Sequence, residues 1–259
     1  MKIIVLLKMV PDVVEELEVA ADGKALDTEY LRLIANELDT QALEEALLLK
    51  EKHGGTITVV ALDAPEVDDA LFTALAKGAD QAFKITDGQA VLSTRAGAYR
   101  LAQALATLPG LLPADLILTG AQANDDLDGL TAPLLSQLLH LPQLGIVTQV
   151  SVDTAGVATV LREFPGGVRG EYEIKLPAVL GIQAAEKPPR YVPVAKVLAA
   201  RKSLAIQSLP APSVADKGGW LQVEQMAKPE VTEHAQMLQG SPEEIADQLC
   251  EILAARGLV

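Results

Sequence analysis

Short apolar runs alternate with amphipathic segments through about the first two-thirds of the chain. The apolar runs, at residues 3–7, 56–62, 81–85 and 115–119, are typical of β-strands that are buried on both faces. Apolar residues three or four apart predict helices between them, at residues 39–52, 66–77, 90–108 and 130–139. Strands separated by such helices form a parallel sheet with right-handed crossovers, so the pattern predicts an α/β fold.

The ends of these elements indicate where helices begin and stop and where ligands could bind. Asp39 or Thr40 is the predicted N-cap of the first helix, which stops before Gly54. In parallel sheets, ligands bind beyond the carboxyl ends of the strands, where the strand order reverses. The loops after residues 7, 62 and 119 are therefore the candidate binding sites.

The pattern changes beyond Gly145 and becomes rich in β-structure. Residues 145–153, 157–164 and 168–176 predict strands joined by short turns, and residues 177–183 add a further strand. Near the N-terminus, a turn at Ala21-Asp22-Gly23 predicts a hairpin over residues 16–25. A short basic helix is expected at residues 192–202, and residues 209–219 have the composition of a linker.

The C-terminal segment begins with a clear helix start. Ser241 is the predicted N-cap, with Pro242 at the first helical position and Glu244 completing a capping box. Four apolar residues then form one stripe: Ile245, Leu249, Ile252 and Leu253. The stripe could pack on the chain's own core, but its separation by a linker favours another chain.

Composition narrows the function classes. The chain of 259 residues is 49% apolar and 22% charged, which indicates a folded protein. A net charge of −14 and few aromatic residues disfavour nucleic acids and anionic membranes as partners. No apolar stretch is long enough for a membrane span, and the N-terminal run is too short for a signal peptide.

The single cysteine and the three histidines offer little chemistry. Cys250 alone excludes an internal disulfide, a zinc finger and a cysteine-held iron–sulfur cluster, and it indicates a reducing cytosol. It is expected to be a small buried hydrophobe and not a nucleophile. His53, His140 and His234 lie far apart in sequence without metal-ligand spacing. The chain also contains no Gly-x-Ser-x-Gly, dinucleotide fingerprint or Walker loop.

The strongest local signal is the segment from Gly120 to Thr131, a polar loop between a buried strand and a helix start. A glycine at 120 would let the backbone approach a ligand closely, and backbone N–H groups with the Thr131 hydroxyl could hold a phosphate. The alternative is an acidic, solvent-facing turn. Three aspartates near a phosphate are unfavourable unless they point outward or cap backbone groups.

A second candidate precedes the first helix. Asn36 or Asp39 could read an adenine edge or a ribose hydroxyl. The simpler alternative is N-capping of the helix.

Taken in order, these segments resemble the beta subunit of electron-transfer flavoproteins. The resemblance runs from about residue 2 to residue 202, and the helical tail also fits. The matching segments are Lys8-Met9-Val10-Pro11-Asp12, Asn36-Glu37-Leu38-Asp39, Ala42-Leu43-Glu44-Glu45-Ala46-Leu47, Ala74-Leu75-Ala76-Lys77-Gly78-Ala79-Asp80, Gly120-Ala121-Gln122-Ala123-Asn124-Asp125-Asp126, Arg162-Glu163-Phe164-Pro165-Gly166-Gly167, Lys175-Leu176-Pro177-Ala178-Val179 and Pro189-Arg190-Tyr191.

The resemblance implies a Rossmann-like parallel sheet of the adenine nucleotide alpha hydrolase-like type, with a β-rich extension and a C-terminal helical arm. It divides the chain into a nucleotide-binding body (1–202, including the extension at 145–183), a linker (203–240) and a terminal helix (241–259) that clasps a partner subunit. That partner is the alpha subunit, which holds the redox FAD. The beta subunit buries AMP or, in electron-bifurcating members, a second FAD.

The resemblance also implies a cytoplasmic electron carrier without catalytic residues of its own. A docking loop, residues 184–190, would meet acyl-CoA dehydrogenases of fatty acid oxidation or other flavoenzymes, and its residues are Ala184, Ala185, Glu186, Lys187 and Arg190. The nucleotide site carried over by position lies at Leu6, residues 36–39, Leu62 and residues 117–131. Its named members are Leu6, Asn36, Asp39, Leu62, Gly120, Gln122, Ala123, Asn124, Asp125, Asp126 and Thr131.

Three departures from the family pattern stand out. Asp63 takes the place of a glycine, and Asp128-Gly129-Leu130 replaces a segment that carries Thr or Asn followed by Gln. Glu186 lies near the position of an apolar docking anchor, which implies a different redox partner. The nucleotide, AMP or FAD, stays open.

Two other functions compete with electron transfer. An adenine-nucleotide sensing protein of universal-stress type would end near residue 150, whereas this chain continues with the β-rich section and the tail. An ATP-pyrophosphatase of the same fold needs a glycine-rich loop after the first strand, and residues 8–12 contain no glycine.

Overall fold

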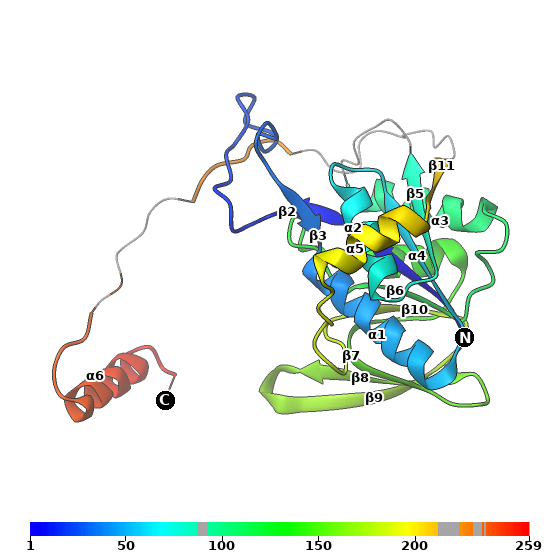
Figure 1. The fold of residues 1–259 in the computed structure, drawn as a ribbon. Helices are drawn as coiled ribbons and strands as arrows, with labels where there is room; N and C mark the ends of the chain where they lie inside the picture. The colour runs from blue at the N-terminus through cyan, green and yellow to red at the C-terminus, as the bar shows by residue number, and fades with distance from the viewer. Residues whose placement is uncertain (87–92, 212–222, 230–234, 236, 259) are drawn as a thin grey trace.

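The computed structural model describes residues 1–86, 93–211, 223–229, 235 and 237–258 (Figure 1). Within these residues the main sheet has nine strands, in the order β11-β5-β4-β1-β6-β10-β7-β8-β9. The strands from β11 to β7 are parallel, and β7, β8 and β9 are antiparallel. Their bounds are β1 Lys2–Leu7, β4 Thr56–Leu62, β5 Gln81–Thr86, β6 Leu116–Gly120, β7 Gln143–Val152, β8 Val157–Phe164, β9 Val168–Lys175, β10 Ala178–Ile182 and β11 Ile206–Pro210.

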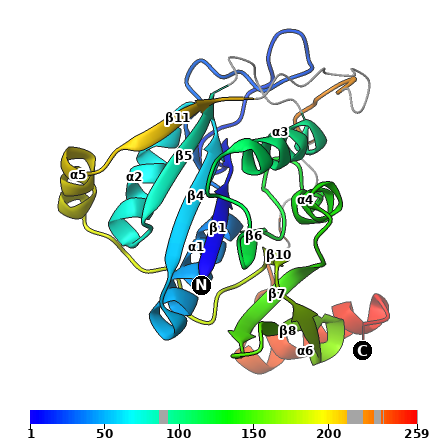
Figure 2. The same ribbon diagram turned by 90° about the vertical axis from the view of Figure 1, so that its right-hand side faces the viewer.

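Helices cover both faces of the parallel part of the sheet (Figure 2). α1 (Glu37–His53) and α2 (Val67–Lys77) pack on the face that receives Ile3 and Val5 of β1. α3 (Thr94–Thr107) and α4 (Thr131–Leu139) pack on the opposite face, which receives Ile4 and Leu6. Because both faces are buried, β1 is apolar at consecutive positions, as its sequence predicts.

Two further elements flank this body. α5 (Val194–Ser203) packs against α2. The short strands β2 (Met9–Pro11) and β3 (Leu33–Ala35) form an antiparallel pair at the carboxyl end of β1. A 3-10 turn, η1 (Pro165–Gly167), joins β8 to β9.

The four strands and the intervening helices predicted from the apolar pattern are confirmed, with corrections at their ends. α1 begins at Glu37 with Asn36 at the N-cap position, so neither Asp39 nor Thr40 is the cap. α3 begins at Thr94 and is capped by Ser93, whose Oγ accepts from the N–H of Ala96. The predicted start of that helix, Ala90, falls outside the described residues.

The β-structure differs from expectation in three places. Instead of the hairpin over residues 16–25, a single bridge joins Val19 to Leu26, and the paired strands are β2 and β3. β10 lies in the middle of the sheet between β6 and β7, and so belongs to the parallel core. The chain after α5 forms β11, which pairs with β5, at residues where the sequence predicts a linker.

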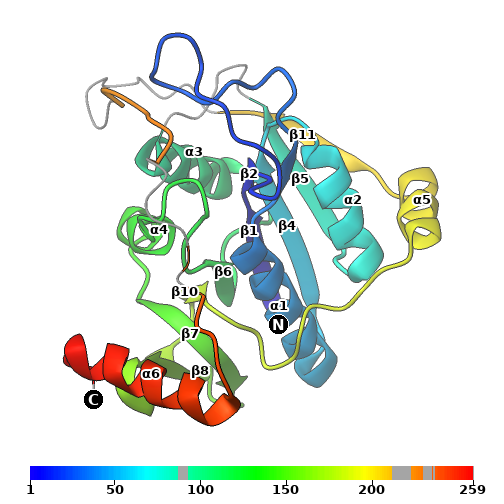
Figure 3. The ribbon, with the colours of Figure 1, turned by 90° about the vertical axis from the view of Figure 1, so that its left-hand side faces the viewer.

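The C-terminal helix α6 (Pro242–Ala255) lies apart from the sheet and its helices in Figure 1, and the view in Figure 3 places it in front of β7 and β8. Its predicted capping box is confirmed, because the Ser241 Oγ accepts from the N–H of Glu244 and the Glu244 side chain accepts from the N–H of Ser241. None of its described side chains is buried, and Leu249 is 47% exposed. Cys250, expected to be buried, is exposed on this helix.

Candidate functional site

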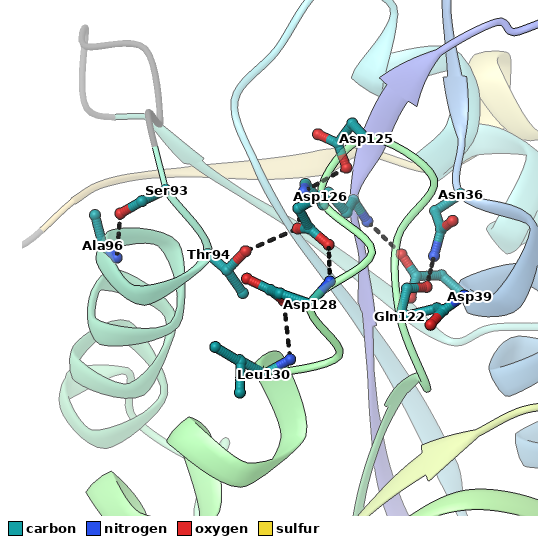
Figure 4. A network of polar contacts seen from close by, with 11 residues as sticks. Asn36, Asp39, Ser93, Thr94, Ala96, Gln122, Asp125, Asp126, Asp128 and Leu130 are labelled. Atoms are coloured by element: carbon teal, nitrogen blue, oxygen red, sulfur yellow. Dashed lines mark hydrogen bonds and ion pairs between the residues drawn. The ribbon is translucent and has the colours of Figure 1, made fainter. Parts of the chain in front are cut away.

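The candidate site lies at the carboxyl ends of β1 and β6, where the strand order reverses. After β1 the chain adds β4 and then β5 on one side of β1 within the sheet, and it then crosses to add β6 on the other side of β1. The loops that follow β1 and β6 and the start of α1 meet there (Figure 4). The sequence-predicted residues of these segments are thus brought together at the position expected for a ligand in an open parallel sheet.

The carboxylate of Asp39 joins the two strand ends to α1. Its Oδ2 accepts from the N–H of Lys8 at 2.8 Å, and its Oδ1 accepts from the N–H of Gly120 at 2.7 Å. Burial raises the pKa of the Asp39 carboxyl to about 6, although the two N–H groups and the Asn36 side chain oppose that rise. Asp39 is therefore a buried acceptor for two remote backbone groups, and both of its oxygens are engaged.

Gly120 is required by this junction. A Cβ added at Gly120 would lie 2.6 Å from the Asp39 Oδ1 and 2.9 Å from the carbonyl carbon of Leu38. The sequence predicts that a ligand lies close to the backbone of Gly120. In the structure the first turn of α1 lies close to it.

Asn36 faces the start of the loop after β6. Its Nδ2 donates to the carbonyl of Gln122 at 2.9 Å, and its backbone N–H donates to the carbonyl of Lys8. Its Oδ1 is buried and has no hydrogen-bond partner among the described residues. A buried acceptor of this kind is costly unless a donor reaches it.

The acidic loop after β6 is held by Lys8. The Nζ of Lys8 lies 2.7 Å from the Asp125 Oδ1 and 2.6 Å from the Asp126 Oδ2. Burial acts to lower the pKa of Lys8, but the hydrogen bonds to the two aspartates outweigh it and the pKa is raised. Asp126 also accepts from the Thr94 Oγ1 at 2.7 Å, which links the loop to α3.

The third aspartate caps the backbone. The Asp128 Oδ1 accepts from the N–H of Leu130 at 2.9 Å, and the N–H of Asp128 donates to Asp126 at 3.2 Å. Gly129 has a φ of +62°, and a Cβ there would lie 3.1 Å from the Ala121 carbonyl. Asp126 and Asp128 thus accept from backbone N–H groups, one of the two arrangements expected to let aspartates lie near an anion, whereas Asp125 is paired with Lys8.

The other predicted residues surround this junction at different depths. Leu6 and Ala123 are buried, and Leu62 is half-buried at the end of β4. Asn124 and the Gln122 side chain are exposed, and Thr131 opens α4 in a half-buried position. Sequence reasoning missed Lys8 and Thr94 as site residues. A lysine directly after a buried strand was the available signal for Lys8.

The predicted docking loop lies along α1 and does not stand free of it. The N–H groups of Ala185, Glu186 and Arg190 donate to side chains of α1. Glu186, expected near a docking anchor, pairs with Lys52 at 3.0 Å.

Comparison with known proteins decides the family. A model of the electron transfer flavoprotein domain matches residues 24–214. The chain is 32% identical to the electron transfer flavoprotein subunit beta of Bacillus subtilis, with 100% of each chain covered. It is 30% identical to that of Methylophilus methylotrophus over 98% of each chain, and 35% identical to that of Syntrophomonas wolfei over 78% of this chain and 77% of the relative.

The chain belongs to the electron transfer flavoprotein beta-subunit family. This membership confirms the resemblance and the electron-transfer role that it implied, and it disfavours a universal-stress protein. The described helices include none that is long and apolar enough to cross a membrane. Within the same residues, no group of three or more His, Cys, Asp or Glu side chains is placed to hold a metal ion.

We expect Gly120→Ala to destabilise the chain by about 1–3 kcal/mol, because the added methyl group meets backbone atoms of α1. The measurement is urea unfolding followed by circular dichroism. Gly145→Ala is the matched control, since nothing lies within 4 Å of a Cβ at Gly145. Equal unfolding midpoints for the two variants would contradict this account of Gly120.

The titration of Asp39 should appear in the pH dependence of stability. Its pKa is raised from 3.8 to about 6 in the fold, so the folded protein binds this proton more tightly than the unfolded chain. The contribution of Asp39 to the free energy of unfolding therefore falls by up to about 3 kcal/mol as the pH rises from about 4 to 6.

Asp39→Asn should remove this pH-dependent contribution, and urea unfolding at several pH values measures it. Asp22→Asn, at an exposed carboxyl group, serves as the control. A difference between wild type and Asp39→Asn that stays constant from pH 4 to 6.5 would contradict the assignment.

Proposed function

We propose that this chain holds an adenine nucleotide, AMP or FAD, at the carboxyl ends of β1 and β6. The observation that carries the proposal is the buried Oδ1 of Asn36, which no described residue satisfies. An exocyclic amino group of an adenine ring is a donor that suits such an oxygen. The neighbouring Nδ2 is fixed on the Gln122 carbonyl, so the amide is already oriented.

The phosphate end of the nucleotide has a separate set of candidate groups. α4 begins at Thr131 and has no side-chain cap, so its first N–H groups and the Thr131 hydroxyl are available to an anion. The nearby aspartates are engaged by Lys8 and by the N–H of Leu130, which reduces their repulsion of a phosphate. The residues present therefore fit an adenine nucleotide.

The proposed setting is a heterodimer. The relatives are named as subunit beta of electron transfer flavoproteins, which supports an alpha subunit as the partner of this chain. The redox FAD held by that alpha subunit supplies the electron chemistry, while this chain positions its nucleotide and its docking loop. In this proposal the chain itself makes and breaks no substrate bond.

The apolar side of α6 supports the same assembly. Leu249 and Leu253 are exposed in the isolated chain, and an apolar stripe on a two-turn or longer helix is stabilised by covering it. We assign this stripe to the alpha subunit and the docking loop to a flavin-dependent dehydrogenase of the acyl-CoA class, in the cytoplasm. The docking loop would then present Glu186 to its partner, near the position where other family members have an apolar anchor.

The nucleotide is tested by extraction from the assembled heterodimer. Denaturation and chromatography should release AMP or FAD from wild type, and the product identifies which of the two is bound. Thr131→Val keeps the side-chain shape but removes the hydroxyl, so nucleotide affinity should fall about tenfold.

Thr107→Val, which removes a hydroxyl that bonds only within α3, is the control for this substitution. Wild-type heterodimer that contains no nucleotide would refute the site. If Thr131→Val retains as much nucleotide as wild type, Thr131 is not part of the site.

The assembly is tested with Leu249→Asp. Burial of a leucine side chain contributes about 1.5–3 kcal/mol, so the substitution should weaken the heterodimer by more than tenfold. The stability of the isolated chain should change by less than about 0.5 kcal/mol, because Leu249 is exposed there.

Co-purification with a tagged alpha subunit measures the first effect, and urea unfolding measures the second. Asp247→Asn on the polar side of α6 is the control. Full retention of the alpha subunit by Leu249→Asp would rule out this role for the helix.

A further inference from the structure

The docking loop is attached to α1 through its backbone. The N–H of Ala185 donates to the Gln41 Oε1 at 3.1 Å, and the N–H of Glu186 donates to the Glu45 Oε2 at 2.9 Å. The N–H of Arg190 donates to the Glu44 Oε2 at 2.9 Å. Residues 41, 44 and 45 share one side of the helix, because they are three and four positions apart. Three side chains of one helix thus hold both ends of a loop that contains two prolines.

Glu44 also engages the Arg190 side chain. Its carboxylate is 3% exposed and lies 2.7 Å from the Arg190 Nη2 and 2.9 Å from the Nε. The remaining Nη1 donates to Glu51 at 2.7 Å, about two turns further along α1. A carboxylate that accepts from both a guanidinium and a backbone N–H fixes the direction of the chain as well as its position.

Glu45 ties the loop to the sheet. Its second oxygen accepts from the N–H of Val150 in β7 at 3.2 Å, so both oxygens are engaged. Burial raises the pKa of Glu45, and the N–H groups of Glu186 and Val150 oppose that rise. Two buried glutamates side by side are costly, and backbone donors from β7 and the loop satisfy them.

This attachment leaves the outward side chains of the loop exposed. Lys187 and Pro188 are exposed, and the adjoining Tyr191 is 84% exposed, although the backbone between them is held. A surface whose backbone is fixed before contact loses less conformational entropy when a partner binds. The contacts with α1 therefore favour association and need not touch the partner.

We propose that Glu44 and Glu45 are positioning residues for electron delivery, because they hold the docking loop in the conformation that a partner flavoprotein meets. The inference rests on the proposed docking function of residues 184–190. The role of the two glutamates is indirect, since they contact the loop backbone and Arg190 and are themselves buried.

Glu45→Gln tests this role within the assembled heterodimer. A glutamine offers one acceptor where Glu45 uses two, so the N–H of either Val150 or Glu186 loses its partner. Hydrogen-exchange mass spectrometry should show about tenfold faster exchange in the peptide spanning residues 184–192. The partner in this assay is an acyl-CoA dehydrogenase that reduces the wild-type heterodimer. Its KM for the variant heterodimer should be about tenfold higher, and its kcat should stay within twofold. Reduction of the flavin by dithionite should be unchanged.

Two further variants make the test specific. Gln41→Leu removes one loop contact without a change of charge, and it should shift exchange and KM in the same direction even if Glu45→Gln fails to fold. Glu29→Gln removes the same charge from an exposed carboxylate away from α1, and it should leave both readouts at the wild-type level.

The outcomes separate this inference from the proposed docking function. Lys187→Glu changes the loop surface itself. If Lys187→Glu alters KM while Glu45→Gln and Gln41→Leu do not, the positioning role is overturned and docking stands. If none of the three alters KM, the docking function fails together with the positioning role. Unchanged hydrogen exchange in Glu45→Gln would also overturn the positioning role.

Discussion

The buried carboxylate of Asp39 is the interaction on which the carboxyl ends of β1 and β6 depend. It accepts from the N–H groups of Lys8 and Gly120, which follow and end adjacent parallel strands. A parallel sheet leaves such strand-end groups without ladder partners, and a buried N–H without an acceptor is costly. By meeting both, Asp39 sets the start of α1 against β1 and β6 and excludes any side chain at Gly120. It also leaves Asn36 beside the loop that we assign to the nucleotide.

α1 connects the two surfaces that the proposed function needs. Its first turn holds the strand ends, and the next turns carry the glutamates that hold the docking loop. The buried polar residues of this helix accept hydrogen bonds from the strand ends and the loop, whereas its apolar residues pack on the sheet. A rigid helix with both sets keeps the ends of β1 and β6 and residues 184–190 at a constant separation.

The sequence predicted most of the fold because its signals were local. Consecutive apolar residues in β1 and β4 follow from burial on both faces, and the capping box of α6 lies within four residues. The misassignments involve contacts between distant segments. Asp39 resembled a helix cap, yet its partners lie 31 and 81 residues away in the chain. Likewise, β11 is a strand because β5 offers it an edge, although its residues lead into a proline-rich segment.

In the candidate site, too, the residues with local signals were predicted and the contacts between distant segments were not. Residues 120–131 were found because a glycine, a polar loop and a helix start occur together in the sequence. Lys8 was not singled out, since its position directly after a buried strand is a weak signal compared with its distances to Asp125 and Asp126. The burial of Glu44 and Glu45 was equally hidden, because glutamates on a helix are usually solvated.

Among the described residues between β11 and α6, Met226 and Lys228 fasten the chain to its N-terminal part, which shortens the tether of the terminal helix. The N–H of Met226 donates to the Gly23 carbonyl, and Lys228 lies 3.2 Å from Glu16. From there only residues 229–240 separate the fastening from Ser241, and a dozen residues span at most about 40 Å. A shorter tether raises the local concentration of α6 around any surface within its radius. Because the Lys228 ion pair is exposed, added salt weakens that part of the fastening, while the backbone hydrogen bond of Met226 carries no charge to be screened.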